Sequence, residues 1–343
     1  MITFRPFGTN KAGEKVTLYT ISNDLASVSI MDLGATVTSF LVKDKNGETK
    51  DIVLGYEEAL PYEEDHDTYF GATVGRCANR IGFGTFSIKD ETYHLPINNG
   101  PHSNHGGKDG FSFRMFKIET FEDSVKATIF SPDGEEGYPG NMELSVLFTL
   151  KGSQLSIEYF AKSDKDTVAN FTNHSFFNLG EENILNHTLQ IFSDAYCEND
   201  ETSLPTGSIL KVDGSSMDFR EPTVLKTRIL NDEPVFNLAG GGLDHNFVLA
   251  FERGEMKKAA TLTCQKTGLC LEVSTDLPGV QIYTANYANV IGKNGMKCGK
   301  HSGAAIETQG FPNAPNTPHF PSTIIKANEE FYSKSVYKIS VIK

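Results

Sequence analysis

The stretch Leu155-Ser156-Ile157-Glu158-Tyr159 alternates apolar and polar residues with a period of two. Because successive side chains of an extended strand point to opposite faces, this pattern predicts a strand with one face in a core. The same alternation recurs at residues 125–129, 260–264, 271–273 and 337–341. Turn signals such as Lys45-Asn46-Gly47 and Pro132-Asp133-Gly134 separate the strands. We therefore predict an all-β fold, a large sandwich of antiparallel sheets, with short helices near residues 56–60 and 223–230.

Length and composition limit the organisation and the partners of the chain. No Pro/Gly/Ser-rich linker or charge run divides its 343 residues, so we expect a single domain over residues 1–343. The formal charge of −13 argues against nucleic acid and anionic membrane surfaces, which select concentrated Lys and Arg. The first residues carry no secretory pattern, and the five cysteines show no C-x-x-C spacing. These features favour a cytoplasmic protein with reduced thiols.

Two titratable residues stand out because of their neighbours. His174 lies in Thr172-Asn173-His174-Ser175-Phe176-Phe177-Asn178, just after a strand expected at residues 168–172, and Glu307 follows Ala304-Ala305-Ile306. For either residue alone, a structural histidine or an exposed strand glutamate is a fair alternative. A carboxylate among apolar neighbours would have a raised pKa unless partners hold it ionised. Together the two side chains could form an acid/base pair.

Further candidates lie in Gly/Asn-rich stretches that are too polar for simple turns. Arg80 follows Asn79 in Gly75-Arg76-Cys77-Ala78-Asn79-Arg80, where it could bind a ligand or form a structural salt bridge. Asp244, after Gly240-Gly241-Gly242-Leu243, could bind hydroxyl groups or simply serve a turn. Gln281 should point to the face opposite Val280 and Ile282. The spacing of His102 and His105 hints at a metal, but no second ligand pair completes a set, so we expect no metal and no cofactor.

Taken together, these segments closely resemble the aldose 1-epimerase (galactose mutarotase) family. The matching motifs occur in the family's order over nearly the whole chain: Gly75-Arg76-Cys77-Ala78-Asn79-Arg80-Ile81, His105-Gly106-Gly107, Asn173-His174-Ser175-Phe176-Phe177-Asn178-Leu179, Leu243-Asp244-His245, Pro278-Gly279-Val280-Gln281 and Glu307-Thr308-Gln309. The departures are Cys77 in place of a common aliphatic residue, Asn104 before the histidine, and Phe176 where tyrosine is frequent.

The resemblance implies a galactose mutarotase-like supersandwich and interconversion of the α and β anomers of free aldohexoses such as galactose and glucose. It makes His174 the general acid to the ring oxygen and Glu307 the base on the anomeric hydroxyl. It also implies sugar-binding residues: Asn79, Arg80, His105, Ser175, Phe176, Asp244 and Gln281. The protein would be an isomerase acting on a small sugar, as a monomer or homodimer.

The chemistry of hemiacetal opening agrees with this assignment. One proton leaves the C1 hydroxyl and another reaches the ring oxygen, so we expect an ionised Glu307 and a protonated His174 near neutrality. Glu307 should then set the acid limb of a bell-shaped pH profile, and His174 the alkaline limb. Two alternatives remain. One is a hexose-6-phosphate 1-epimerase, which needs a basic cluster not evident beyond Arg80. The other is a non-catalytic sugar-binding protein of the same fold, which could lose either member of the pair.

Overall fold

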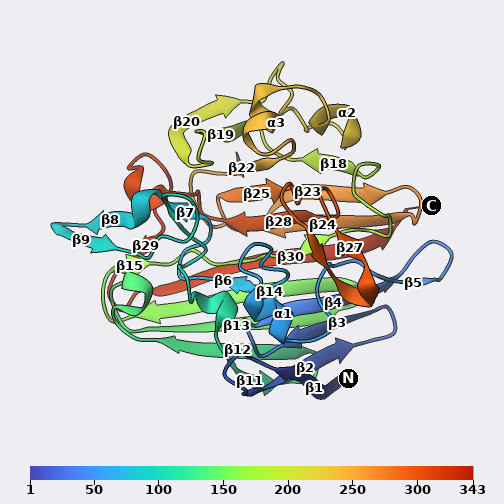
Figure 1. Ribbon diagram of the computed structural model, residues 1–343, viewed down its shortest axis with the longest axis horizontal. Coiled ribbons are helices and arrows are strands. Elements are labelled where there is room, and N and C mark those ends of the chain that lie inside the picture. The colour runs from blue at the N-terminus through green and yellow to red at the C-terminus, as the bar shows by residue number, and fades with distance from the viewer. Residues whose placement is uncertain (343) are drawn as a thin grey trace.

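The computed structural model describes residues 1–342 and consists mainly of antiparallel strands (Figure 1). The largest sheet has nine strands. In spatial order they are β11 (Lys117–Thr120), β12 (Ser124–Ser131), β13 (Met142–Lys151), β14 (Gln154–Ser163), β30 (Glu330–Val341), β24 (Leu269–Thr275), β23 (Lys257–Cys264), β18 (Thr188–Ile191) and β21 (Thr223–Val224). Every stretch predicted from alternation lies in one of these strands.

Two further sheets complete the sandwich. The five-stranded sheet contains, in order, β1 (Ile2–Thr9), β2 (Lys15–Ser22), β3 (Ala26–Met31), β4 (Thr36–Lys43) and β5 (Thr49–Asp51). The six-stranded sheet contains β17 (Phe176–Phe177), β28 (Ala304–Gln309), β25 (Gly279–Tyr283), β22 (Asp244–Val248), β19 (Ala195–Asn199) and β20 (Pro205–Lys211). Phe40, Val146 and Ile306, one from each sheet, belong to the same buried cluster. The predicted large antiparallel sandwich is therefore confirmed.

Short strand pairs connect the large sheets and carry much of the polar sequence. They are β6 (Thr73–Val74) with β16 (Thr172–Asn173), β7 (Arg80–Ile81) with β10 (Ser103–Asn104), β8 (Thr85–Ile88) with β9 (Glu91–His94), β15 (Thr167–Val168) with β29 (Ile324–Ile325), and β26 (Val290–Ile291) with β27 (Lys297–Cys298). The single strand predicted at residues 168–172 is wrong. It divides into β15 and β16, which pair with different partners, and Asn170 between them bridges to Cys77.

The helices are few and short: α1 (Leu60–Glu64), α2 (Lys226–Ile229) and α3 (Pro234–Leu238). The helix predicted at residues 56–60 begins only where that range ends, because Pro61 suits the first turn of α1. The helix predicted at residues 223–230 is shorter, because Thr223 and Val224 pair with β18 before α2 begins. Between residues 1 and 342, no helix has the length and apolar character needed to cross a membrane.

Candidate active site

Glu307 lies on β28, in the interior of the six-stranded sheet. It is directly opposite Gln281 on β25, and Gln281 is opposite Asn246 on β22. Since side chains in register share a face, and every second residue of a strand does so too, Asp244 and Tyr283 lie on this face as well. The side chain of Glu307 is only 1% exposed, and its Oε2 has no hydrogen-bond partner within residues 1–342.

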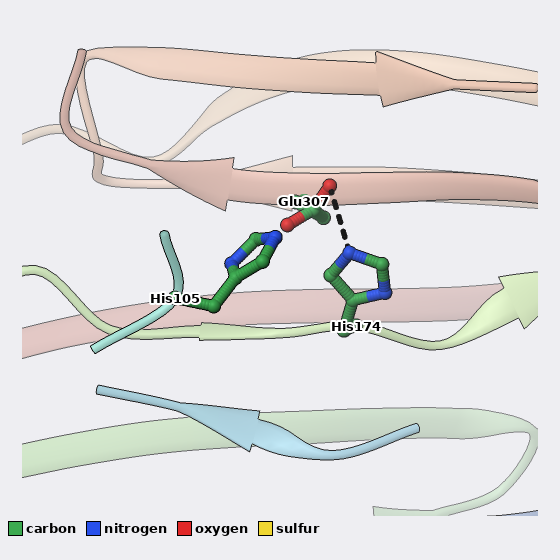
Figure 2. Close-up of side chains that lie close together, drawn as sticks. All are labelled: His105, His174 and Glu307. Atoms are coloured by element: carbon green, nitrogen blue, oxygen red, sulfur yellow. Dashed lines mark ion pairs between the residues drawn. The ribbon is translucent and has the colours of Figure 1, made fainter. Parts of the chain in front are cut away.

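His174 directly follows β16 and is held by backbone hydrogen bonds on both sides. Its N–H donates to the carbonyl of Ala72, and its own carbonyl accepts the N–H of Gly71. This anchoring directs the imidazole at β28, where Nε2 lies 3.5 Å from Oε1 of Glu307 (Figure 2). Two segments distant in the sequence thus bring an imidazole and a carboxyl group together in a buried site.

Burial shifts the protonation of both groups toward their neutral forms. Loss of water raises the pKa of Glu307 well above its usual range, with a further increase from Asp244 and a decrease from Arg80. Loss of water also lowers the pKa of His174. A neutral carboxylic acid beside a neutral imidazole has one titratable proton, and that proton is on the carboxyl group. A carboxylate beside an imidazolium also has one titratable proton, which is then on the ring. The sequence predicts that this proton is on His174 and that Glu307 is ionised. Burial instead favours a proton on Glu307 and a neutral His174.

His105 approaches the same carboxyl group from a different segment. In Figure 2, the carboxyl group of Glu307 lies near both imidazoles, and the rings of His105 and His174 meet edge to face with centroids 5.0 Å apart. Nδ1 of His105 accepts the backbone N–H of Asn79 at 3.3 Å. Burial, with smaller contributions from His174 and Arg80, holds the pKa of His105 well below its usual value, so its proton resides on Nε2. His105 is thereby a hydrogen-bond donor at Nε2.

The tautomer of His105 also bears on metal binding. His105, His174 and Glu307 each offer a ligand atom, and these atoms lie within 4.8 Å of one another. A ligand nitrogen must present a lone pair, but Nε2 of His105 carries a proton while Nδ1 accepts from Asn79. His102 does not join this cluster, because its own ring nitrogens contact Phe83 and Thr202. The arrangement thus suits hydrogen bonding to a ligand better than metal coordination.

Arg80, Asp244 and Gln281 form a connected polar wall. The Nε2 amide of Gln281 donates to Oδ1 of Asp244 at 2.6 Å, and Nη2 of Arg80 lies 3.8 Å from Oδ2 of the same carboxylate. Arg80 Nε also donates to Oδ1 of Asn99 at 3.0 Å. These contacts hold the three side chains in place, and Arg80 and Asp244 still line a cavity.

The remaining predicted residues fall into two groups. Asn79 and Phe176 line the cavity, and the Phe176 ring lies 5.2 Å from that of His174. Ser175 and Gln281 are not among the described residues that line it. The Ser175 hydroxyl donates to Oδ1 of Asn173 at 2.6 Å, and Gln281 acts on the cavity through Asp244.

The cavity has a volume of about 620 Å³, within the range of small-molecule sites. Its lining includes residues that we did not predict: Tyr69, Asn98, Asn99, Asn104, Tyr283 and Tyr287. The three asparagines belong to one of the Gly/Asn-rich stretches. Tyr283 lies two residues after Gln281, so strand alternation could have placed it on the same face. No signal in the sequence pointed to Tyr69, whose ring lies 4.8 Å from that of His105 and 5.8 Å from that of His174.

Comparison with known families matches residues 17–338 to the model described as aldose 1-epimerase. The chain belongs to the aldose 1-epimerase family. It is 42% identical to the galactose mutarotase of Mus musculus over 334 residues, covering 96% of this chain and 95% of that one. It is 40% identical to the galactose mutarotase of Homo sapiens, covering 96% and 95%, and 32% identical to the aldose 1-epimerase of Escherichia coli K12, covering 95% and 96%. The chain is accordingly an isomerase of carbohydrate metabolism.

Solved structures of aldose 1-epimerase relatives share the fold. The GalM/aldose epimerase homologue from C. elegans superimposes with a TM-score of 0.87 at 28% identity, over the full length of both chains. The galactose 1-epimerase from Lactobacillus acidophilus NCFM gives a TM-score of 0.86 at 28% identity, covering 100% of this chain and 99% of that one. The supersandwich implied by the sequence motifs is confirmed.

Proposed function

We propose that this aldose 1-epimerase interconverts the anomers of free aldohexoses, such as galactose and glucose, with Glu307 and His174 as the catalytic acid/base pair. The observation that carries the proposal is the 3.5 Å separation of Nε2 and Oε1 at the wall of a cavity of about 620 Å³. Two proton-transfer groups this close can act on the two oxygens bonded to one carbon atom, which is what C1 of a pyranose presents.

In this mechanism the Glu307 carboxylate takes the proton of the C1 hydroxyl while the His174 imidazolium gives its proton to the ring oxygen. The bond from C1 to the ring oxygen breaks, and its electrons remain on that oxygen as the C1 carbonyl forms. The open-chain aldehyde rotates about C1–C2. Closure on the other carbonyl face returns the hydroxyl proton to His174 and the Glu307 proton to the former carbonyl oxygen, so no proton is gained or lost.

Burial favours the protonation state that the pair reaches after ring opening. After opening, Glu307 is neutral and His174 is neutral, which is the distribution that burial favours. The mechanism therefore requires the bound sugar to stabilise the ion-paired distribution, by donating hydroxyl hydrogen bonds to the carboxylate. Burial therefore stabilises the pair in the open-chain state relative to the ion pair that begins the reaction.

Other groups would hold the sugar. His105 donates through Nε2, Asp244 accepts from hydroxyl groups, and Arg80 donates beside it. Asn79 and the rings of Phe176 and Tyr283 complete the cavity wall. A cavity built to pair hydroxyl groups strongly rejects analogues that lack them.

Charge favours a free sugar over a phosphorylated one. The described lining holds three carboxylates, Asp67, Glu201 and Asp244, and the carboxyl group of Glu307, against a single arginine, Arg80, and no lysine. A dianionic phosphate would meet net repulsion there. The proximity of both catalytic groups likewise favours an enzyme over a sugar-binding protein, which needs neither proton transfer.

Polarimetry on freshly dissolved α-D-glucose or α-D-galactose tests the activity, with D-glucose 6-phosphate as the comparison substrate. We expect the free sugars to reach equilibrium rotation faster with catalytic amounts of protein, and the phosphorylated sugar to show little acceleration. Equal or greater acceleration with the phosphorylated sugar would contradict the proposed specificity.

We also propose that the protein acts in the cytoplasm as a monomer or homodimer, without nucleic acid or membrane partners. Its net charge of −13 supports the exclusion of polyanionic partners. Light scattering after size exclusion would measure the oligomeric state, and a trimer or larger assembly would contradict this proposal.

A further inference from the structure

His102 joins a turn beside the cavity to a loop of the cavity wall through its two ring nitrogens. Nδ1 accepts the backbone N–H of Phe83 at 3.1 Å, and Nε2 lies 2.7 Å from Oγ1 of Thr202. Phe83 belongs to the turn η1 (Gly82–Gly84), and Thr202 to the loop between β19 and β20. The turn directly follows β7, which carries Arg80, and the loop supplies Glu201, Thr202 and Ser203 to the cavity.

The contacts of His102 settle its tautomer. A backbone N–H can only donate, so Nδ1 is the acceptor and the proton of the neutral ring is on Nε2. Nε2 therefore donates to Thr202, whose hydroxyl donates in turn to Oδ1 of Asp200 at 2.6 Å. His102 is 1% exposed, and burial together with Arg80 lowers its pKa, which keeps the ring neutral. Every donor in this chain of hydrogen bonds has an acceptor.

Packing reinforces the same junction. The φ angle of Phe83 is 53°, in the left-handed region, and its ring meets that of His102 edge to face at 5.3 Å. A Cβ atom added to Gly82 would lie 3.0 Å from Cδ2 of Leu204, so the turn and the loop are in close contact. On the loop, Asp200 Oδ1 also accepts the N–H groups of Thr202 and Leu204. Thr202 itself is exposed, so the bond from His102 is its tie to the body of the protein.

We propose that His102 is a positioning residue that fixes the loop of residues 200–204 over the cavity and thereby strengthens sugar binding. This inference rests on the proposed function, because it takes the cavity as the sugar site. His102 lies away from the His174–Glu307 pair and transfers no proton in the reaction. Its loss should therefore raise KM and leave kcat near the wild-type value.

Two substitutions remove the tie from opposite sides. Thr202→Val removes the hydroxyl that receives the bond, and with it the bond that this hydroxyl donates to Asp200 within the loop. His102→Asn keeps an acceptor near the Nδ1 position but cannot reach Thr202. We expect each to raise KM about three- to tenfold, the range of one lost hydrogen bond, with kcat within about twofold. The double variant should have the same KM as Thr202→Val alone, since the bond from His102 is already lost in that variant. His102→Gln, whose amide can still donate toward Thr202, should recover part of the loss.

Thr206→Val is the matched control. Thr206 lies on β20, is exposed, and donates its hydroxyl to Glu198 at 2.9 Å, outside the cavity lining. We expect a wild-type KM for this variant. Because Thr202 is exposed, Thr202→Val carries the test even if His102→Asn fails to fold.

Polarimetry over a range of sugar concentrations gives KM and kcat for each variant. An unchanged KM in Thr202→Val, a fall in kcat as large as the rise in KM, additive effects in the double variant, or an equal rise in Thr206→Val would each overturn the inference. If wild-type protein fails to epimerise any free aldohexose, the proposed function falls and this inference with it. An active wild type with an unchanged KM in Thr202→Val overturns only the role of His102.

Discussion

Glu158 on β14 and Glu307 on β28 are both strand glutamates, but their surroundings differ. Buried and more exposed residues alternate along β14 from Ile157 onward, and the Glu158 carboxylate lies on the more exposed face, 3.3 Å from Nζ of Lys334 and 2.7 Å from the hydroxyl of Tyr332. All six residues of β28 are buried. Glu307 meets no lysine or arginine within salt-bridge distance in the described chain, and its near partner is an imidazole that burial keeps neutral.

The difference shows where this fold gives up stability by burying a carboxyl group. A carboxylate that is paired near the surface costs little free energy to place there and contributes little to the stability of the folded state. One that is removed from water without a charged partner has a raised pKa and destabilises the folded state whenever it ionises. The same residue type in the same kind of strand is therefore an ion-pair partner near the surface in one sheet and a buried carboxyl group with a raised pKa in the other.

The largest expected effect comes from Glu307→Gln, which retains the shape but removes the base. We expect kcat to fall about 10²- to 10⁴-fold, the usual contribution of a positioned base. Glu158→Gln is the control and should keep wild-type kcat. Polarimetry measures both, and a Glu307→Gln variant with kcat within a few-fold of wild type would remove Glu307 from the mechanism.

Asp244→Asn should have the next largest effect. The amide retains an acceptor for Gln281 but loses the charge that strengthens bonds from sugar hydroxyl groups. We expect kcat/KM to fall about ten- to a hundredfold, mainly through KM. Asp213→Asn, at an exposed carboxylate paired with Arg220, should leave both constants unchanged. An effect confined to kcat would instead give Asp244 a part in proton transfer.

The pH dependence of kcat/KM should be bell-shaped, with a plateau across neutrality. The active pair holds one proton. It gains a second at low pH as His174, whose pKa is lowered, becomes charged, and it loses its only proton at high pH as Glu307, whose pKa is raised, ionises. The limbs are thus assigned in the reverse of the order predicted from sequence. Each limb should fall about tenfold per pH unit. A profile unchanged from mildly acid to strongly alkaline pH would contradict the shared proton.

The smallest expected effect is on stability. The pKa of Glu307 is higher in the folded than in the unfolded state. Its contribution to the stability of the folded state is therefore fully present below pH ~4 and is lost as pH rises through the folded pKa. Glu307→Gln cannot ionise at this position and does not lose stability in this way. It should be more stable than wild type by about 1–3 kcal/mol at pH 8 and nearly equal at pH 4. Urea unfolding at the two pH values tests this, with Glu158→Gln as the matched variant. If the difference in unfolding free energy between Glu307→Gln and wild type were the same at both pH values, the raised pKa of Glu307 would not be the cause of that difference.

Much of the fold could be predicted because alternation records which face of a strand meets the core. Residues 155–159 and 337–341 were assigned to strands correctly for this reason. Residues 168–172 were not, because the chain changes partners at Asn170, and pairing is decided by distant segments. The short helices were misplaced for a similar reason, since local propensity did not reveal that Thr223 and Val224 pair with β18.

The candidate site shows the same division. Alternation alone places Gln281 opposite its apolar neighbours, and the family motifs single out His174 and Glu307, whose catalytic roles stay predictions. The sequence could not show that the Ser175 hydroxyl donates to Asn173, or that Tyr69 packs against the imidazoles of His105 and His174. These contacts depend on which segments of the chain the fold brings together.

The sequence by itself determined that this chain forms antiparallel sheets, because strand period is a local property, and its motifs resemble those of the aldose 1-epimerase family in their order along the chain. Only the tertiary structure decided that burial favours the neutral forms of His174 and Glu307 and that His102 and His105 each hold their proton on Nε2. Protonation depends on the loss of water and on the partners that folding brings within a few ångströms, and neither is written in the order of the residues.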